Sequence, residues 1–258
     1  MKHPNGLFTW SDVALPDPKA GAEFYGELLG WKAEQGSPDE SMPYWMLTKD
    51  GKTVAGMGGL SDEQQAQGIP PMWSSYINVD DIEATVALAK EAGANVVMEP
   101  MQIFDSGKMA FLVDPAGAAV GLWQAGTHTG ADEFNTTGFM CWNELATRDV
   151  EGSIAFYTKV FGWTADTEVM ERGSYTTFKV GDRPNGGAYD GSKMLPEGVP
   201  SNWSVYFTVD DCDATVAKIK EFGGTLNMGP FDTPVGRTAA VADSQGANFI
   251  VIQMAEEA

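Results

Sequence analysis

An internal repeat covers nearly all of the 258 residues of the chain. The segment GAEFYGELLGW at 21–31 returns as GSIAFYTKVFGW at 152–163, and the segment at 72–93 returns almost unchanged in pattern at 202–223. A repeat of this length is that of a whole domain rather than of a small structural unit. The sequence therefore predicts two homologous domains, at 1–125 and 138–258, joined by a linker at 126–137.

Within each half, a shorter pattern occurs twice: a strand-like apolar run, an aspartate, a helical pattern and three β-rich segments. The aspartates suit helix N-caps, because their carboxylates accept backbone N–H groups; they are Asp17, Asp81, Asp149 and Asp211. Apolar spacing predicts helices at 18–29 and 82–92, and a glycine stands where each helix should stop, at Gly30, Gly93, Gly162 and Gly223. The β-rich segments of the first half are 31–35, 43–50, 53–60, 95–103, 109–114 and 118–125. The pattern predicts an α+β fold of four β-α-β-β-β modules with curved mixed sheets and outer helices.

The composition disfavours several classes of function. A net charge of −20 opposes binding to nucleic acid phosphates and to anionic membrane surfaces. No apolar stretch approaches the roughly 20 residues of a membrane span, and the start MKHPNGLFTW lacks the apolar run of a signal peptide. Two cysteines fit a reducing compartment, so we expect a cytoplasmic protein. The thirteen methionines are expected to fill the core.

Three short motifs, two of which occur twice, mark the helices and turns. They are the helix ends Phe24-Tyr25 to Trp31 and Phe156-Tyr157 to Trp163, the V-D-D sequences at 79–81 and 209–211, and the D-P-x-G turn at 114–117. These motifs resemble the vicinal oxygen chelate superfamily, which includes glyoxalase I, bleomycin resistance proteins and extradiol dioxygenases. The resemblance covers about the whole chain and implies two tandem glyoxalase-like domains, as in two-domain glyoxalase-like "hydroxylase" proteins of actinobacteria. Because this fold hosts many reactions, the resemblance specifies the fold more closely than the function.

The resemblance also implies a divalent metal, held by His and Glu side chains on the concave face of paired modules, that polarises the substrate. At the positions of the metal ligands this sequence has Trp10, Ser74, Trp142, Ser204, Gly121 and Ile250. None of these is a competent ligand for a divalent ion. The two histidines, His3 and His128, lie in the N-terminal tail and in a Gly/Thr-rich stretch. We therefore expect no metal and no cofactor.

The same strands can instead line a small-molecule pocket. Alternate strand residues share a face, which pairs Trp10 with Asp12, Trp142 with Glu144, Ser74 with Tyr76 and Ser204 with Tyr206. Together they combine aromatic rings with a few polar groups, as small-molecule sites do. An alternative stays open, in which Trp10 and Trp142 fill the places of the metals as core residues.

Four charged residues and one further tryptophan are additional candidates. Asp12 and Glu144 can act as catalytic bases if they are buried; otherwise they are polar groups of a pocket or exposed strand residues. Lys108 and Arg237 each follow a glycine at matching positions, either as an anion clamp or as surface ion pairs. Trp45 is a further ligand-binding candidate on a late strand, and its counterpart in the second half is Thr176.

These observations favour a small-molecule-binding protein of the bleomycin-resistance kind, which holds a planar or partly apolar ligand in aromatic clefts. A metal-independent lyase, isomerase or hydroxylase-like tailoring enzyme is the second hypothesis, in which Glu144 or Asp12 moves a proton and Tyr206 or Arg237 stabilises an oxyanion. The third is a structural or interaction protein whose tryptophans fill both pockets. We expect a monomer or homodimer whose partner is a small molecule, not nucleic acid or a membrane.

Overall fold

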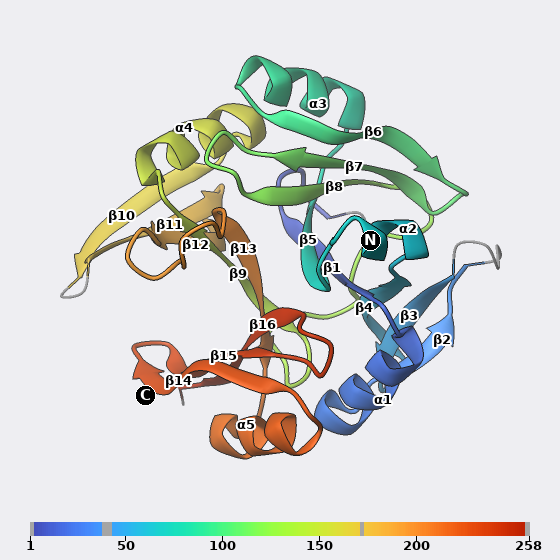
Figure 1. Ribbon diagram of the computed structural model, residues 1–258. Helices are drawn as coiled ribbons and strands as arrows, with labels where there is room; N and C mark the ends of the chain where they lie inside the picture. Colours follow the sequence, from blue (N-terminus) through green and yellow to red (C-terminus); the bar gives the residue numbers. More distant parts are fainter. Residues whose placement is uncertain (1–2, 38–42, 171–172, 256–258) are drawn as a thin grey trace. The chain divides into compact units, whose positions relative to one another are not determined.

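The computed structural model of the protein describes residues 3–37, 43–170 and 173–255. In this part of the chain, sixteen strands form two mixed sheets of eight, in the orders β2-β3-β4-β1-β5-β8-β7-β6 and β10-β11-β12-β9-β13-β16-β15-β14 (Figure 1). Each half of each sheet comes from one predicted β-α-β-β-β module. The predicted α+β fold of four modules is therefore confirmed.

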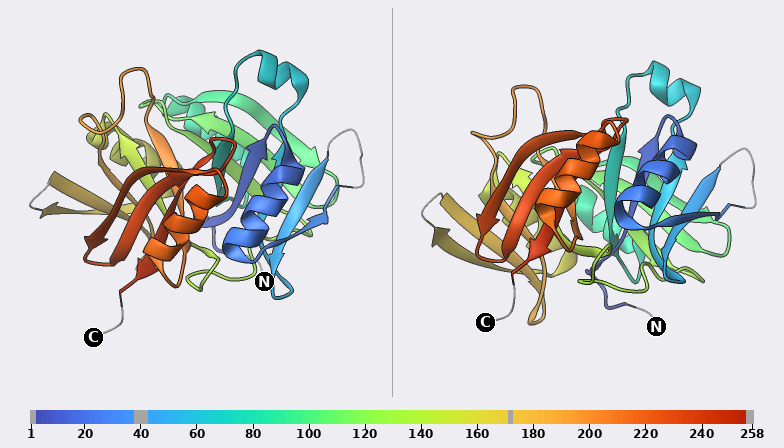
Figure 2. Two further views of the ribbon diagram at one scale, coloured as in Figure 1. Left: turned by 60° about the horizontal axis from the view of Figure 1, so that its bottom comes forward. Right: turned by 90° about the horizontal axis from the view of Figure 1, so that it is seen from below.

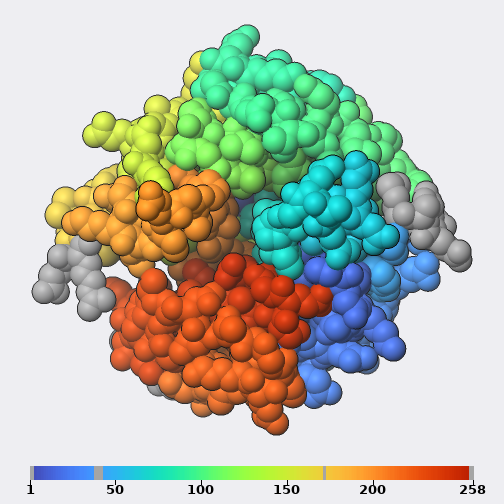
Figure 3. Space-filling view, in the orientation of Figure 1, coloured from blue at the N-terminus to red at the C-terminus, as the bar shows by residue number. Residues whose placement is uncertain are grey.

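The first half of the chain supplies two modules. The first contains β1 (Phe8–Leu15), α1 (Pro18–Leu29), β2 (Lys32–Gln35), β3 (Tyr44–Lys49) and β4 (Lys52–Gly59). The second contains β5 (Met72–Asn78), α3 (Ile82–Glu91), β6 (Asn95–Ile103), β7 (Gly107–Val113) and β8 (Ala119–Ala125). Between them lies a short helix that the sequence analysis did not predict, α2 (Asp62–Ala66), which buries none of its residues and stands on the surface (Figure 3).

The second half repeats the order of elements. The third module contains β9 (Met140–Thr147), α4 (Val150–Phe161), β10 (Thr164–Met170), β11 (Gly173–Val180) and β12 (Arg183–Asp190). The fourth contains β13 (Asn202–Thr208), α5 (Cys212–Glu221), β14 (Thr225–Thr233), β15 (Gly236–Ala242) and β16 (Asn248–Met254). The helix and strand segments predicted for the first half agree with the structure to within a few residues at their ends.

Local sequence sets where the four long helices begin and end. Each N-cap aspartate accepts the backbone N–H of the residue three positions later, at 2.9–3.1 Å, as predicted; these residues are Asp17, Asp81, Asp149 and Asp211. Helices α1 and α4 end at Gly30 and Gly162, with φ of 73° and 68°. These angles lie in the left-handed region that glycine adopts without steric strain.

Contacts divide the chain into two compact units, and each unit draws segments from both halves of the repeat. Unit 1 comprises Met1–Trp10, Ser74–Gly130 and Trp142–Ser204, so it holds most of the second and third modules. Unit 2 comprises Ser11–Trp73, Ala131–Cys141 and Val205–Ala258, so it holds most of the first and fourth. Which modules pack together is therefore not decided by their order along the chain.

Each unit has an apolar core between its helices and its strands. In unit 1, α3 packs against β6, β7 and β8, and α4 against β10 and β12 (Figure 1). In unit 2, α5 packs against β14, β15 and β16 (Figure 2), and α1 against β2 and β4. The cores contain Ile77, Leu122, Phe156 and Trp163 in unit 1 and Leu15, Met57, Phe207 and Phe249 in unit 2.

The expectation that methionines fill the core is wrong for most of those that the structure describes. Met57 and Met140 are buried, but Met101, Met170 and Met228 are exposed by 41%, 45% and 42%. These three lie on β6, β10 and β14, which are edge strands of the sheets. A side chain at a sheet edge has neighbours on one side only, so it stays accessible.

A buried tyrosine joins the two modules of each unit. In unit 2, Tyr25 of α1 donates a hydrogen bond to Asp243 Oδ2 at 2.8 Å, across 218 residues, and accepts one from Trp73 Nε1 at 2.9 Å. In unit 1, Tyr157 of α4 donates to Asp114 Oδ2 at 3.1 Å and accepts from Trp203 Nε1 at 2.7 Å. In each unit the FY helix motif therefore contacts an aspartate-led turn, which is the D-P-x-G turn in unit 1 and the Asp-Ser-Gln-Gly turn at 243–246 in unit 2.

Among the helices of the described residues, none is both long enough and apolar enough to cross a membrane.

Replacing Tyr157 with phenylalanine tests the buried hydrogen bonds. Tyr157→Phe leaves the buried Asp114 carboxylate and the Trp203 indole without this partner, so we expect a loss of about 1–3 kcal/mol in the free energy of unfolding, measured with urea. Tyr189→Phe is the control, because its half-buried hydroxyl has no hydrogen bond to any described residue, and it should change stability by less than about 0.5 kcal/mol. Equal stabilities of the two variants would show that the hydrogen bonds of Tyr157 do not stabilise the protein.

Candidate functional site

Strands β9, β11 and β12 present a polar, aromatic face on the side turned away from α4, which we call the distal face. Leu145, Phe178 and Ala188 point the other way, into the core of unit 1. Because alternate strand residues point to opposite sides, the distal face carries Trp142 and Glu144 of β9, Tyr175 of β11 and Tyr189 of β12. All four side chains are half-buried, so they are ordered by neighbours yet accessible.

A hydrogen-bonded chain connects three of these side chains. Trp142 Nε1 donates to the Tyr175 hydroxyl at 3.0 Å, and this hydroxyl donates to Glu144 Oε1 at 2.9 Å. Gly187 lies opposite Glu144 in the register of β12 with β9, and a Cβ at Gly187 would overlap the Tyr175 hydroxyl. The phenol reaches Glu144 because this position is glycine.

The negative charge of Glu144 acts on both tyrosines. Burial, and next the Glu144 carboxylate, raise the pKa of Tyr175 well above its ordinary value. The same two causes, in the same order, raise the pKa of Tyr189 to about 12. Since a neutral phenol can donate a proton to a hydrogen bond, both residues are donors at neutral pH.

Unit 2 contains a copy of the acid–tyrosine pair. The Tyr44 hydroxyl donates to Asp12 Oδ2 at 3.2 Å, and Gly56 lies opposite Asp12 in the register of β1 with β4. A Cβ at Gly56 would again overlap the tyrosine hydroxyl. The copies differ at the position of Tyr189, where the first half has Gly58.

In unit 1, the candidates Trp10 and Tyr76 lie in aromatic clusters. Trp10 is 3% exposed, and its ring meets the ring of His128 edge-on at 4.4 Å between centroids. The ring of His128 also meets the ring of Trp123, at 5.6 Å between centroids. Tyr76 is 4% exposed and packs edge-on against Phe111. This arrangement matches the alternative in which Trp10 is a core residue, whereas Trp142 is half-buried.

The candidates Ser74, Ser204 and Tyr206 are half-buried. In unit 2, the backbone carbonyl of Tyr206 accepts a contact from Cys141 Sγ at 3.7 Å, and Tyr206 lies opposite Ile250 in the register of β13 with β16. Neither serine is part of the Trp142–Tyr175–Glu144 chain.

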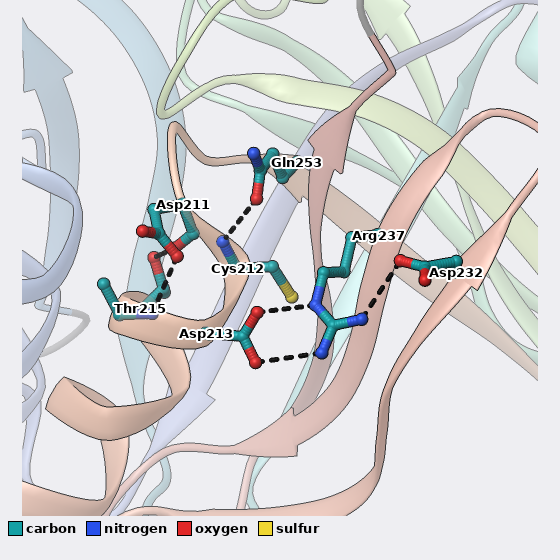
Figure 4. Close-up of polar contacts among 8 residues, drawn as sticks. Asp211, Cys212, Asp213, Thr215, Asp232, Arg237 and Gln253 are labelled. Carbon is teal, nitrogen blue, oxygen red and sulfur yellow. Dashed lines mark hydrogen bonds and ion pairs between the residues drawn. The ribbon is translucent and has the colours of Figure 1, made fainter.

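Three other candidates lie on faces that helices cover. Trp45 packs against the core of unit 2 and lies opposite the buried Met57, so its side chain points away from that of the adjacent Tyr44. Lys108 forms an ion pair with Glu83 of α3 at 2.5 Å. Arg237 bonds to both oxygens of Asp213 of α5 and, at 3.0 Å, to Asp232 (Figure 4). Both cations thus have acidic partners, and the structure does not join them to the distal face of β9–β12.

The residues at the six expected metal positions do not fit the metal of the family. The ring of Tyr76 lies over Gly121, so close that a Cβ there would overlap it, and the Trp10 indole lies against His128. Indole, aliphatic and glycine positions offer no oxygen or imidazole ligand, and the neutral hydroxyls of Ser74 and Ser204 are poor ligands for a divalent ion. Within residues 3–37, 43–170 and 173–255, no three or more His, Cys, Asp or Glu side chains group in a way that could hold a metal ion.

Sequence reasoning missed Tyr44, Tyr175, Tyr189 and His128. A signal for two of them was present, since Tyr44 and Tyr175 keep the 131-residue offset that also relates Gly56 to Gly187. Comparing the two halves position by position would have found a tyrosine and a glycine repeated together. Nothing in the repeat marks His128, because its position depends on the path of the chain after β8.

Comparison with known proteins gives consistent matches along the whole chain. The profile of the Glyoxalase/Bleomycin resistance protein/Dioxygenase superfamily matches residues 8–122 and 139–251. The glyoxylase-like protein CFP32 of Mycobacterium tuberculosis is 40% identical over 99% of this chain and 98% of that protein. The anthracycline biosynthesis protein DnrV of Streptomyces peucetius is 33% identical over 97% of this chain and 94% of that protein.

Solved structures with the same fold are more distant in sequence. An Mn(II)-bound glyoxalase from Novosphingobium aromaticivorans has a TM-score of 0.63 at 14% identity, over 97% of this chain and 84% of that one. The 2,3-dioxygenase LapB from Pseudomonas sp. KL28 has a TM-score of 0.63 at 13% identity, over 96% of this chain and 93% of that one. At such low identity these likenesses concern the fold alone.

The charge of Glu144 can be tested through the pKa of Tyr189. Glu144→Gln removes a negative charge that disfavours the phenolate, so the pKa of Tyr189 should fall from about 12 toward the ordinary value of about 10. Burial should keep it above that value. Carbon-13 NMR of the tyrosine Cζ during a pH titration, assigned with Tyr189→Phe, measures the change. Glu151→Gln, which removes an exposed charge on α4, is the control; equal shifts in both variants would show that Glu144 has no specific effect.

Proposed function

Because the chain belongs to the Glyoxalase/Bleomycin resistance protein/Dioxygenase superfamily, a family with many chemistries on one fold, we propose its function from the site: it binds a planar, partly apolar small molecule on the distal face of β9–β12. The proposed site consists of Trp142, Glu144, Tyr175 and Tyr189. It works without the metal of the family, since the residues at the ligand positions do not supply ligands.

The observation that carries this proposal is the hydrogen-bonded chain from Trp142 through Tyr175 to Glu144 on an accessible face. Each side chain is fixed by its neighbour, and ordered rings and acceptors bind a ligand at a lower entropic cost than mobile ones. An indole offers a flat apolar surface for stacking, while the carboxylate accepts hydrogen bonds from the edge of the ligand. An apolar ring beside a few polar groups is the usual composition of a small-molecule site.

Two further observations support a planar ligand and this location. DnrV is described as an anthracycline biosynthesis protein, and anthracyclines contain fused planar rings. In the first half of the chain, by contrast, Trp10 and Tyr76 are almost fully buried against other aromatic rings. We leave Trp45, Lys108 and Arg237 outside the site, since their side chains lie on faces that helices cover.

Binding can be measured with 2-hydroxy-9-fluorenone, a planar tricyclic probe, by calorimetry and by quenching of tryptophan fluorescence. The wild-type protein should bind it saturably. Glu144→Gln should weaken binding about tenfold or more, because hydrogen bonds to charged groups contribute roughly 1.5–3 kcal/mol. Tyr175→Phe should weaken it through loss of the hydrogen bonds that fix Glu144 and Trp142.

The internal repeat provides a matched control for this experiment. Tyr44→Phe removes the equivalent hydroxyl in unit 2 and should leave the affinity unchanged, as should Glu151→Gln on α4. Lack of saturable binding to the wild type refutes the proposal, and equal effects of Tyr44→Phe and Tyr175→Phe refute the location of the site.

A second candidate function is proton transfer by Glu144, which its hydrogen bond with Tyr175 favours. A carboxylate held by a phenol can accept a proton from a bound carbonyl compound while a second phenol donates to the developing oxyanion. The enolisable ketone 2-tetralone tests this in heavy water, where NMR should show deuterium entering next to its carbonyl faster than in buffer. Glu144→Gln should reduce the exchange to the buffer rate, and exchange that persists in this variant excludes Glu144 as the base.

A further inference from the structure

The hydroxyl of Tyr189 makes no hydrogen bond within the described part of the chain. Tyr189 is half-buried on β12, and none of the described residues donates to its hydroxyl or accepts from it. The equivalent position in the first half is Gly58, on β4. Since the same fold forms with a glycine at that position, neither the ring nor the hydroxyl of Tyr189 is required to build the sheet.

Strand register places Tyr189 beside the polar groups of the distal face. It lies directly opposite Tyr175 in β11, and Glu144 lies opposite Gly187, two residues before Tyr189 on the same strand. Paired strands lie about 4.8 Å apart and each residue advances about 3.3 Å, so diagonal neighbours of this kind are within reach of aromatic and long side chains. The electrostatic effect of Glu144 on the Tyr189 phenol agrees with this placement.

Donor and acceptor roles on this face are divided between two side chains. The single hydroxyl proton of Tyr175 is directed at Glu144, so the phenol proton of Tyr189 is the one left for a ligand. Tyr189 stays neutral up to high pH, since its pKa is raised to about 12. A carboxylate has about four acceptor sites on its two oxygens, so Glu144 can accept a further hydrogen bond while it holds Tyr175.

We propose that Tyr189 determines ligand specificity by donating a hydrogen bond to a carbonyl oxygen of the ligand, while Glu144 accepts one from a ring hydroxyl. The class of ligand is then a planar aromatic compound with a carbonyl and a hydroxyl group on the same edge. This inference rests on the proposed function, because it specifies the ligand of that same site. Trp142 provides the stacking surface, and the two polar groups select by hydrogen bonding.

Three nearly isosteric probes separate the two hydrogen bonds. 2-Hydroxy-9-fluorenone has both groups, 9-fluorenone has only the carbonyl, and 2-hydroxyfluorene has only the hydroxyl. Calorimetry measures their affinities for the wild type, Tyr189→Phe, Glu144→Gln and the control Tyr44→Phe. Tyr189→Phe keeps the aromatic ring, so it tests the hydroxyl rather than the packing.

We expect Tyr189→Phe to weaken binding of the two ketones by about three- to tenfold, the equivalent of one neutral hydrogen bond, and to leave 2-hydroxyfluorene unchanged. Glu144→Gln should weaken the two hydroxylated probes and leave 9-fluorenone unchanged. Circular dichroism spectra that match the wild type establish that both variants are folded.

The possible failures are distinguishable. If the wild type binds the probes but Tyr189→Phe weakens all three equally, or none, the assignment of Tyr189 is overturned while the proposed binding function stands. If 2-hydroxyfluorene is the probe that Tyr189→Phe weakens, the donor and acceptor roles are overturned. If none of the three probes binds the wild type, both the binding function and the inference are overturned.

Discussion

The hydrogen bond from a buried tyrosine to a buried aspartate is the interaction on which each unit depends. Tyr25 and Tyr157 are fully enclosed, and each connects a helix of one module to the turn between two strands of another. Burial raises the pKa of Asp114, which shows that the enclosure opposes its charge, and the hydrogen bonds from Tyr157 and the backbone counteract it. A polar group placed so deeply requires its partner, so the modules must meet in one orientation.

The same principle of close, specific approach forms the distal face. A glycine opposite an acid lets a tyrosine from the next strand reach the carboxylate, and this occurs in both halves, at Gly56 and Gly187. The acid–tyrosine pair is therefore a property of the module. One position differs: the second half has Tyr189 where the first has Gly58. The repeat thus supplies a common framework, and one copy carries an additional phenol on it.

Much of the fold could be predicted from the sequence because the relevant signals are local. N-cap aspartates, glycine stops and apolar spacing act within a few residues, so the predicted helices and strands match the structure closely. Half of the proposed site was also predictable, since alternation on a single strand puts Trp142 and Glu144 on one face. Tyr175 and Tyr189 were not predicted. They lie on β11 and β12, more than 30 residues from Glu144, and they reach that face only because β12 pairs with β9 and β11 pairs with β12.

By itself, the sequence determined the repeat, the module and its place in a superfamily, and it predicted that the family's metal-ligand positions hold other residues. Only the tertiary structure decided that the second module packs with the third and the first with the fourth. It also decided that Trp45 points into a core while its neighbour Tyr44 meets an acid, and that His128 reaches Trp10. The physical reason is the same in each case: a local pattern fixes which side of a strand a residue occupies, but its partner depends on strand register and on contacts between distant segments.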